Sequence, residues 1–174
     1  MPSLVGSEMC IRDRYTQDYD GYVMPACAYT KATHNNWKRW TYILLTAGFI
    51  DEWKLNYRRL NNIIACPSEA ELYYISNYAP NARLGTQVCY VHDDCQYQGK
   101  RLSRLNKPSE TMFIADMGRF NNSMIYTYQQ GAGSGYIKAR HSNGADMLFL
   151  DGHVKWMVLD DFPVDFNGTF WSGN

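Results

Sequence analysis

The clearest hydrophobic pattern in the chain is a pair of apolar runs on either side of Asp151-Gly152. An Asp-Gly pair between two such runs predicts a β-hairpin with a two-residue type I′ turn, in which both central residues take positive φ. That turn would pair Phe149 with Val154. Because side chains alternate across a strand, we expect one face of the hairpin to belong to the core, with Ala145, Met147, Phe149, Val154, Trp156 and Val158 on it.

Other segments carry simpler patterns. Residues 110–116 form an apolar run that predicts a buried strand ending at Asp116. Residues 37–47 predict a helix that ends at Gly48, because apolar side chains recur on one helical face at Trp37, Trp40, Leu44 and Ala47. Weaker apolar runs at 62–66 and 123–128 predict short strands. The tail, residues 160–174, has no clear period, and we expect Phe170-Trp171 to dock on the surface.

The beginning of the chain differs from the rest. Residues 1–14 show neither a helical nor a strand period and resemble a translated sequencing adaptor, so we expect a non-native, disordered leader. Residues 15–20 are typical of the last turns of a helix, with Gly21 as a left-handed residue after its end. We therefore expect one globular domain over residues 15–174, with the fold class α+β: an antiparallel sheet of about four strands and one or two short helices.

Composition narrows the possible functions. The chain has 17 basic and 17 acidic residues and no net charge, which argues against a nucleic-acid-binding surface. It contains no run of 18 apolar residues, the minimum for a membrane-spanning helix. It is rich in tyrosine, with 14 residues. This composition is typical of a protein with β-structure and many loops.

Several motifs, taken in order, resemble one protein family. His141, nine further residues and Asp151-Gly152 form an H-X9-DG signature. This signature and its context resemble the planctomycete-type, prepilin-type processing-associated proteins, which are similar to type IV pilins and type II secretion pseudopilins. The resemblance extends over residues 15–158, and four further segments carry it: residues 15–22, Cys66-Pro-Ser, residues 107–116 and residues 140–156.

The resemblance implies a pilin-like fold, in which a long apolar N-terminal helix packs on an antiparallel sheet. Most of that helix and its cleavage motif would be missing here, and the sheet should expose an apolar strip where the helix packs. The implied function is that of a non-catalytic structural subunit of an extracellular pilus or type II secretion-like pseudopilus. Its partners would be other pilin-like subunits, bound through the missing helix. The protein would be held in the inner membrane by that helix before assembly at the cell surface.

Four cysteines remain when Cys10 of the leader is set aside. In an exported protein they favour two disulfides, for which we prefer Cys89–Cys95 and Cys27–Cys66. Two alternatives to the disulfides stay open. In the first, all four thiols are free. In the second, Cys89-x-x-His92-x-x-Cys95 binds zinc, with Cys66 as a fourth ligand.

His141, Asp151 and Asp116 are the candidates for a metal site, and with His153 they suggest a hydrolytic or calcium site. A structural role is favoured, because Asp151 suits a turn and His141 can bond to nearby backbone or to Asp151. We therefore predict no catalytic residue and no cofactor, with calcium and a metal-dependent hydrolase as alternatives.

A second function remains open beside the structural one. Tyrosines gather in the turn-rich middle of the chain, and their rings and hydroxyls suit stacking on a glycan or contact with a partner protein. An extracellular binding module is therefore the alternative, with Tyr73, Tyr74, Tyr78, Tyr90 and Tyr97 as its candidate residues.

Overall fold

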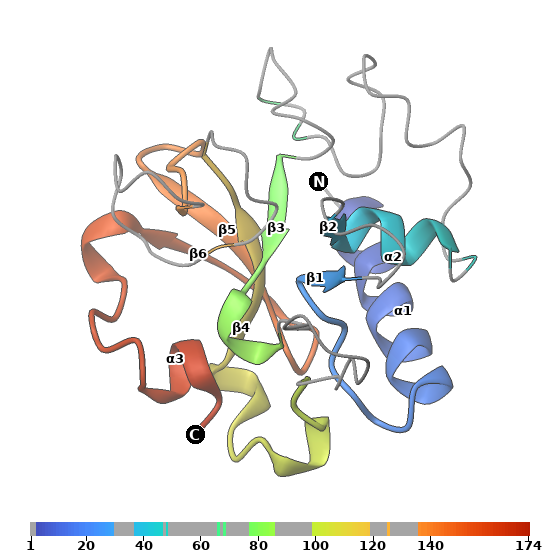
Figure 1. Cartoon of the computed structure of the whole chain (residues 1–174). Helices are drawn as coiled ribbons and strands as arrows, with labels where there is room; N and C mark the ends of the chain where they lie inside the picture. The colour runs from blue at the N-terminus through green and yellow to red at the C-terminus, as the bar shows by residue number, and fades with distance from the viewer. Residues whose placement is uncertain are drawn as a thin grey trace.

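The computed structural model of the chain describes residues 3–29, 37–46, 48, 66, 68, 77–85, 99–118, 125 and 136–174. At its centre lies a four-stranded antiparallel sheet in the order β3-β4-β5-β6 (Figure 1). Its strands are β3 (Tyr78–Pro80), β4 (Met112–Asp116), β5 (Gly144–Phe149) and β6 (Val154–Val158). The sheet and the short helices around it confirm the predicted α+β class.

The remaining elements surround this sheet. The α-helices are α1 (Ser3–Asp18), α2 (Trp40–Thr46) and α3 (Thr169–Ser172). A separate antiparallel pair consists of β1 (Cys27–Tyr29) and β2 (Trp37–Arg39). Short 3₁₀ helices lie at Ala82–Leu84, Leu102–Arg104, Pro108–Glu110 and Leu159–Asp161. None of the described helices combines the length and the apolar character that crossing a membrane requires.

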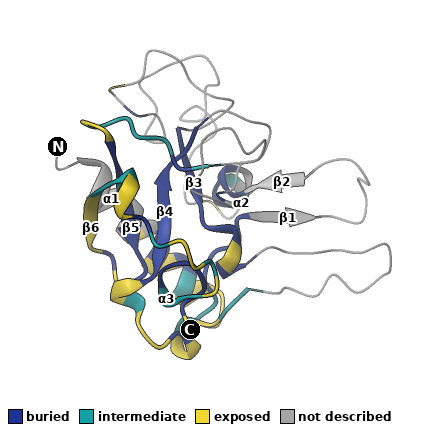
Figure 2. Cartoon of the chain, turned by 90° about the vertical axis from the view of Figure 1, so that its left-hand side faces the viewer, coloured by how far each residue is buried: buried dark blue, intermediate teal, exposed yellow. Residues whose placement is uncertain are grey.

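The sheet is covered on both faces. Helices α1 and α2 lie to one side of it and α3 to the other (Figure 1). On the α3 side the buried cluster includes Met112, Ala115, Met147, Phe149, Phe170 and Trp171. On the opposite side it includes Tyr15, Trp40, Leu44, Ile114, Leu148 and Leu150. Strand β4 is therefore buried along its whole length, whereas β6 begins exposed (Figure 2).

An irregularity in β4 lets two consecutive residues face the same cluster. The pairing with β5 shifts by one residue between Met112 and Ile114. Such a bulge sets two residues of one strand opposite one residue of its neighbour. Phe113 and Ile114 both join the cluster on the α1 side as a result.

The register of the β5–β6 hairpin differs by one residue from the predicted register. Leu148 pairs with Val154, where a two-residue turn would pair Phe149 with Val154. The Gly152 amide donates to the Phe149 carbonyl over 3.0 Å, and the Phe149 amide donates to the His153 carbonyl over 2.9 Å. Only Gly152 takes a positive φ in this turn, +97°. The loop therefore has three residues and closes as a type I turn followed by a glycine bulge.

The shift moves the side chains of β6 to the opposite face of the sheet. The predicted core positions of β5 are confirmed, because Ala145, Met147 and Phe149 are buried. The predicted core positions of β6 are wrong, because the residues there are exposed or half-buried: Val154, Trp156 and Val158. Trp156 is 43% exposed and donates from Nε1 to the His141 carbonyl over 2.7 Å.

The helix that contains Tyr15 extends back to Ser3, so residues 3–14 of the expected leader are helical in the structure. Leu, Met, Glu and Arg in this stretch have high helix propensity, and an existing helical turn extends at little further cost. Arg12 Nη1 also donates to the Leu150 carbonyl over 2.6 Å. The helix ends at Asp18, two residues before the predicted end, and Gly21 takes a positive φ of +77° as predicted.

Two other predictions need correction. The predicted helix over 37–47 begins only at Trp40, because residues 37–39 pair with β1. Trp40 and Leu44 do share its buried face, and Gly48 follows it at φ +73°. In the tail, Phe170 and Trp171 belong to the core, and Trp171 is fully buried. Of the weak strands at 62–66 and 123–128, all but Cys66 and Ile125 lie outside the described residues.

Substitutions at Gly152 test the bulged turn. Gly152→Ala should lower the free energy of unfolding by about 1–2 kcal/mol, because a Cβ atom is strained at positive φ. Gly152→Asn should cost less, since asparagine tolerates that region better. Urea denaturation of the wild type and both variants measures the difference. Equal losses for the two variants would contradict a glycine bulge at this position.

Candidate functional site

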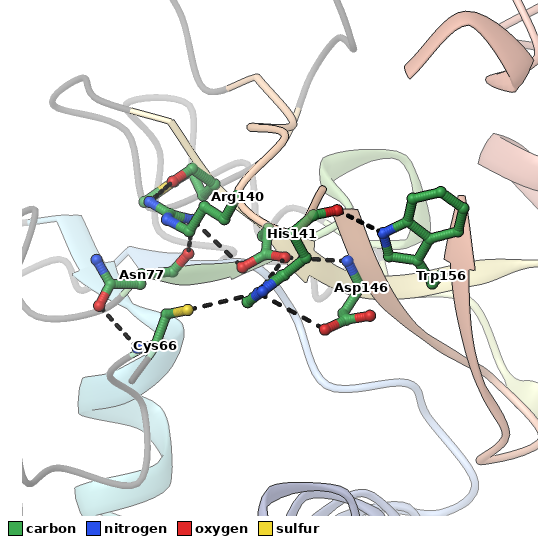
Figure 3. Close-up of polar contacts among 8 residues, drawn as sticks. Cys66, Asn77, Arg140, His141, Asp146 and Trp156 are labelled. Atoms are coloured by element: carbon green, nitrogen blue, oxygen red, sulfur yellow. Dashed lines mark hydrogen bonds and ion pairs between the residues drawn. The ribbon is translucent and has the colours of Figure 1, made fainter. Parts of the chain in front are cut away.

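Three segments that are distant in the sequence bring reactive side chains together at one end of the sheet (Figure 3). The Sγ atom of Cys66, a carboxylate oxygen of Asp116 and a ring nitrogen of His141 all lie within 4.8 Å of one another. The same three segments, around Cys66, at 107–116 and at 140–156, carry the family resemblance. We call Cys66, Asp116 and His141 the Cys-Asp-His cluster.

A tight turn places His141. Its amide and carbonyl exchange hydrogen bonds of 3.0 Å with those of Gly144. Between them, Ser142 and Asn143 take positive φ of +51° and +63°. Both central residues of a type I′ turn have this geometry. The type I′ turn predicted at Asp151-Gly152 is thus found at the other end of β5, where it sets His141 beside the end of β4.

Asp116 is the buried charge of the site. Its side chain is 0% exposed, and its Oδ1 atom lies 3.3 Å from Nη1 of Arg140, whose side chain is 2% exposed. Its Oδ2 atom accepts a hydrogen bond of 3.0 Å from the Asp146 amide. Burial raises the pKa of Asp116, and the Asp146 amide and the Arg140 guanidinium offset part of that effect. The carboxylate is thus held by one cation and one backbone donor.

Hydrogen bonds of Arg140 and Asn77 connect the Asp116 carboxylate with the ends of the neighbouring strands and with Cys66. Arg140 Nη1 also donates to the Asn77 carbonyl over 2.9 Å, and Nη2 donates to the Met117 carbonyl. The Oδ1 atom of Asn77 accepts a hydrogen bond of 2.8 Å from the Cys66 amide. Cys66, although distant in sequence, is therefore fixed against the end of β4.

The ring of His141 presents one nitrogen to the whole cluster. Its Nε2 atom lies 3.5 Å from Cys66 Sγ, 3.4 Å from Asp116 Oδ2 and 3.6 Å from Asp146 Oδ2. A nucleophile–histidine–acid relay uses both ring nitrogens, one for the nucleophile and one for the acid. Here sulfur and carboxylates converge on the same nitrogen. This geometry does not provide the proton relay of a cysteine hydrolase.

The structure brings together only two of the three residues predicted as candidates for a metal site, His141, Asp116 and Asp151. His141 and Asp116 meet, but Asp151 lies at the opposite end of β5. There its Oδ1 atom is 2.6 Å from His153 Nδ1 and accepts from the His153 amide over 3.1 Å. Slight burial acts to raise the pKa of Asp151, but these two contacts outweigh it and lower the pKa. Asp151 is therefore a residue of the turn.

Of the four cysteines in the predicted disulfides, only Cys66 has a described side chain. Cys66 is buried with a free thiol, so the Cys27–Cys66 disulfide is not formed. The physical reason is the direction of Sγ, which faces His141. The other preferred pair, Cys89–Cys95, and the zinc alternative with His92 lie outside the described residues.

Sequence reasoning missed Arg140, Asn77 and Asp146 as parts of this site. A signal for Arg140 was present, because an acidic residue that ends a wholly apolar strand needs a buried counter-charge. The tyrosine-rich surface gains no support from Tyr78, which is buried in β3. Tyr73, Tyr74, Tyr90 and Tyr97 lie outside the described residues.

Comparisons of the chain with protein-family models, with curated proteins and with solved structures give no match. What the chain does must therefore be inferred from its own residues and their geometry.

Removing the buried cation should be costly. Arg140→Met leaves Asp116 as an uncompensated buried charge and should lower the free energy of unfolding by about 3–5 kcal/mol. Arg104→Met is the matched control at an exposed position and should change stability by only about 0.5 kcal/mol. Guanidinium denaturation compares the two variants with the wild type. Similar small losses for both would mean that Arg140 does not neutralise Asp116.

Proposed function

We propose that the chain is a non-catalytic structural subunit of a pilin-like assembly, an extracellular pilus or a type II secretion-like pseudopilus. The observation that carries this proposal is the packing of an N-terminal helix on the H-X9-DG hairpin. Tyr15 of α1 is 3% exposed and belongs to the same buried cluster as Leu148 and Leu150. A helix whose C-terminal end rests on an antiparallel sheet is the arrangement that the resemblance implies.

The end of this helix supports the proposal. Tyr15 stacks on Tyr19 with ring centroids 4.2 Å apart. The Gly21 amide donates to the Thr16 carbonyl over 2.8 Å, so the chain turns sharply after the helix and returns toward the sheet. The C-terminal end of the helix is thereby fixed against the domain, and a longer helix would extend from its other end. Such a subunit works by helix packing and by presenting its surface.

An exposed apolar pair on β6 also supports an assembly role. Val154 and Trp156 are 38% and 43% exposed and lie on the same face of the strand. Strand β6 is at the edge of the sheet, and exposed apolar side chains on an edge suit contact with a neighbouring subunit. The proposed partners are other pilin-like subunits, and the proposed location is the cell surface, with an inner-membrane helix before assembly.

The docking of α1 can be measured with two tyrosines of one stacked pair. Tyr15→Ala should lower the free energy of unfolding by about 3 kcal/mol, because it opens a cavity between helix and sheet. Tyr19→Ala removes the same stacking contact at a position that is 43% exposed and should cost about 1 kcal/mol or less. Urea denaturation gives both values. Equal losses would show that the helix does not depend on the sheet.

The proposal also predicts what the gene encodes before Tyr15. Genomic DNA upstream of this codon should encode a Gly-Phe-Thr-Leu-Ile-Glu-like motif followed by about 20 apolar residues, the length of a membrane span. Coexpression of that gene with a prepilin peptidase should shorten the product by its leader, as measured by intact mass. Substituting the glycine of the motif should prevent the cleavage. An upstream sequence without an apolar helix would exclude the pilin-like function.

A further inference from the structure

We propose that the Cys-Asp-His cluster binds a zinc ion through Cys66, Asp116 and His141, with Asp146 at the open side of the site. The three ligand atoms lie within 4.8 Å of one another. Cys66 and the Asp116 side chain are fully buried. The inference is independent of the proposed assembly role, because it rests on side chains inside the domain.

Hydrogen bonding alone accounts poorly for the carboxylate distances around His141. Nitrogen–oxygen hydrogen bonds are usually about 2.7–3.2 Å long. The Nε2 atom lies 3.4 Å and 3.6 Å from the Asp116 and Asp146 oxygens, and 3.5 Å from Cys66 Sγ. A neutral ring nitrogen has one proton or one lone pair, so it cannot serve three partners at once.

The same distances fit the edges of a coordination tetrahedron. Zinc binds sulfur at about 2.3 Å and histidine nitrogen or carboxylate oxygen at about 2.0–2.2 Å. At a tetrahedral angle these bond lengths place neighbouring ligand atoms about 3.3–3.7 Å apart. The His141–Cys66 distance of 3.5 Å and the His141–Asp116 distance of 3.4 Å lie within this range. A cation at the centre would use the nitrogen lone pair and both neighbouring ligands together.

The charges and the surrounding hydrogen bonds also suit a divalent cation. A zinc ion and Arg140 together carry three positive charges, which balance a Cys66 thiolate and the carboxylates of Asp116 and Asp146. Asp116 accepts a hydrogen bond from the Asp146 amide. The Cys66 amide donates one to the Asn77 side chain. Such supporting bonds are typical around metal ligands.

The ligand types favour zinc over calcium. Calcium requires six to eight oxygen ligands, whereas sulfur and imidazole nitrogen are common zinc ligands. The site is also open on one side, because the side chains of His141 and Asp146 are 20% and 47% exposed. Metal and water can therefore reach the fourth position beside Asp146.

Zinc binding by the whole chain tests the inference. The reduced protein is equilibrated with zinc chloride, dialysed, and analysed for bound zinc by elemental mass spectrometry. We expect about one zinc per chain in the wild type and in Cys10→Ser, whose thiol is exposed and outside the site. Cys66→Ser and His141→Gln should bind at least about 100-fold more weakly while circular dichroism shows that they remain folded.

Two further measurements keep the result decisive if a variant does not fold. The wild type loaded with cobalt(II) should show a thiolate-to-cobalt charge-transfer band. The band should persist in Cys89→Ser/Cys95→Ser, because those residues belong to the alternative zinc motif. Loss of the band in that double variant would assign the metal to the other motif and overturn the proposal. It would also be overturned if the wild type binds no zinc, or if folded Cys66→Ser binds as tightly as the wild type.

Discussion

A carboxylate that is removed from water must find its counter-charge and its donors within the protein, and Asp116 imposes this requirement on the centre of the fold. Its side chain is 0% exposed and is satisfied by Arg140 and by the Asp146 amide. Asp116, Arg140 and Asp146 lie at the end of β4, in the segment before β5 and in β5 itself, respectively. A buried ion pair is a weak source of net stability but defines one arrangement, because few alternatives satisfy all its groups. The ends of β4 and β5 are held together by this condition.

The hydrophobic core is built on the same two strands. β5 contributes to both clusters, with Met147 facing α3 and Leu148 facing α1. β4 does the same through its bulge, which directs Phe113 and Ile114 to the α1 side. Because these strands are covered on both faces, the helices on each side pack against side chains of the same two strands. The edge strand β6 is free of this constraint and carries the exposed Trp156.

The amino-acid pattern located β4, β5 and β6 but missed β3 and the β1–β2 pair, and it did not determine the turns. Apolar runs located β4 and the alternation of β5, because burial dictates both. The Asp-Gly pair was compatible with a two-residue or a three-residue loop, and local residues do not distinguish them. Cross-strand packing decides, as in the stacking of Phe149 on His153 with centroids 4.4 Å apart.

The candidate site was predictable only in part for a similar reason. Asp116 was recognisable because it ends an apolar run, and His141 because it begins the H-X9-DG spacing. The contact of His141 with Cys66 spans 75 residues of sequence, and no local pattern encodes a contact over that distance. The free-thiol alternative for Cys66 is the one found in the structure, because its sulfur faces an imidazole. The disulfide preference came from counting cysteines, which ignores where they point.

The two turns that bound β5 give the H-X9-DG spacing a meaning as a count of residues. His141 precedes a two-residue turn, and Asp151 lies in the loop that follows Phe149. Between the turns, odd-numbered side chains such as Met147 face α3, while Leu148 faces the opposite cluster. Inserting or deleting one residue would exchange these two sets and move Leu148 to the wrong side of the sheet. An even change in length would preserve the faces but displace the loop relative to the cluster. The nine residues between His141 and Asp151 are therefore the number needed for one turn and strand β5, with each side chain of β5 on its correct face.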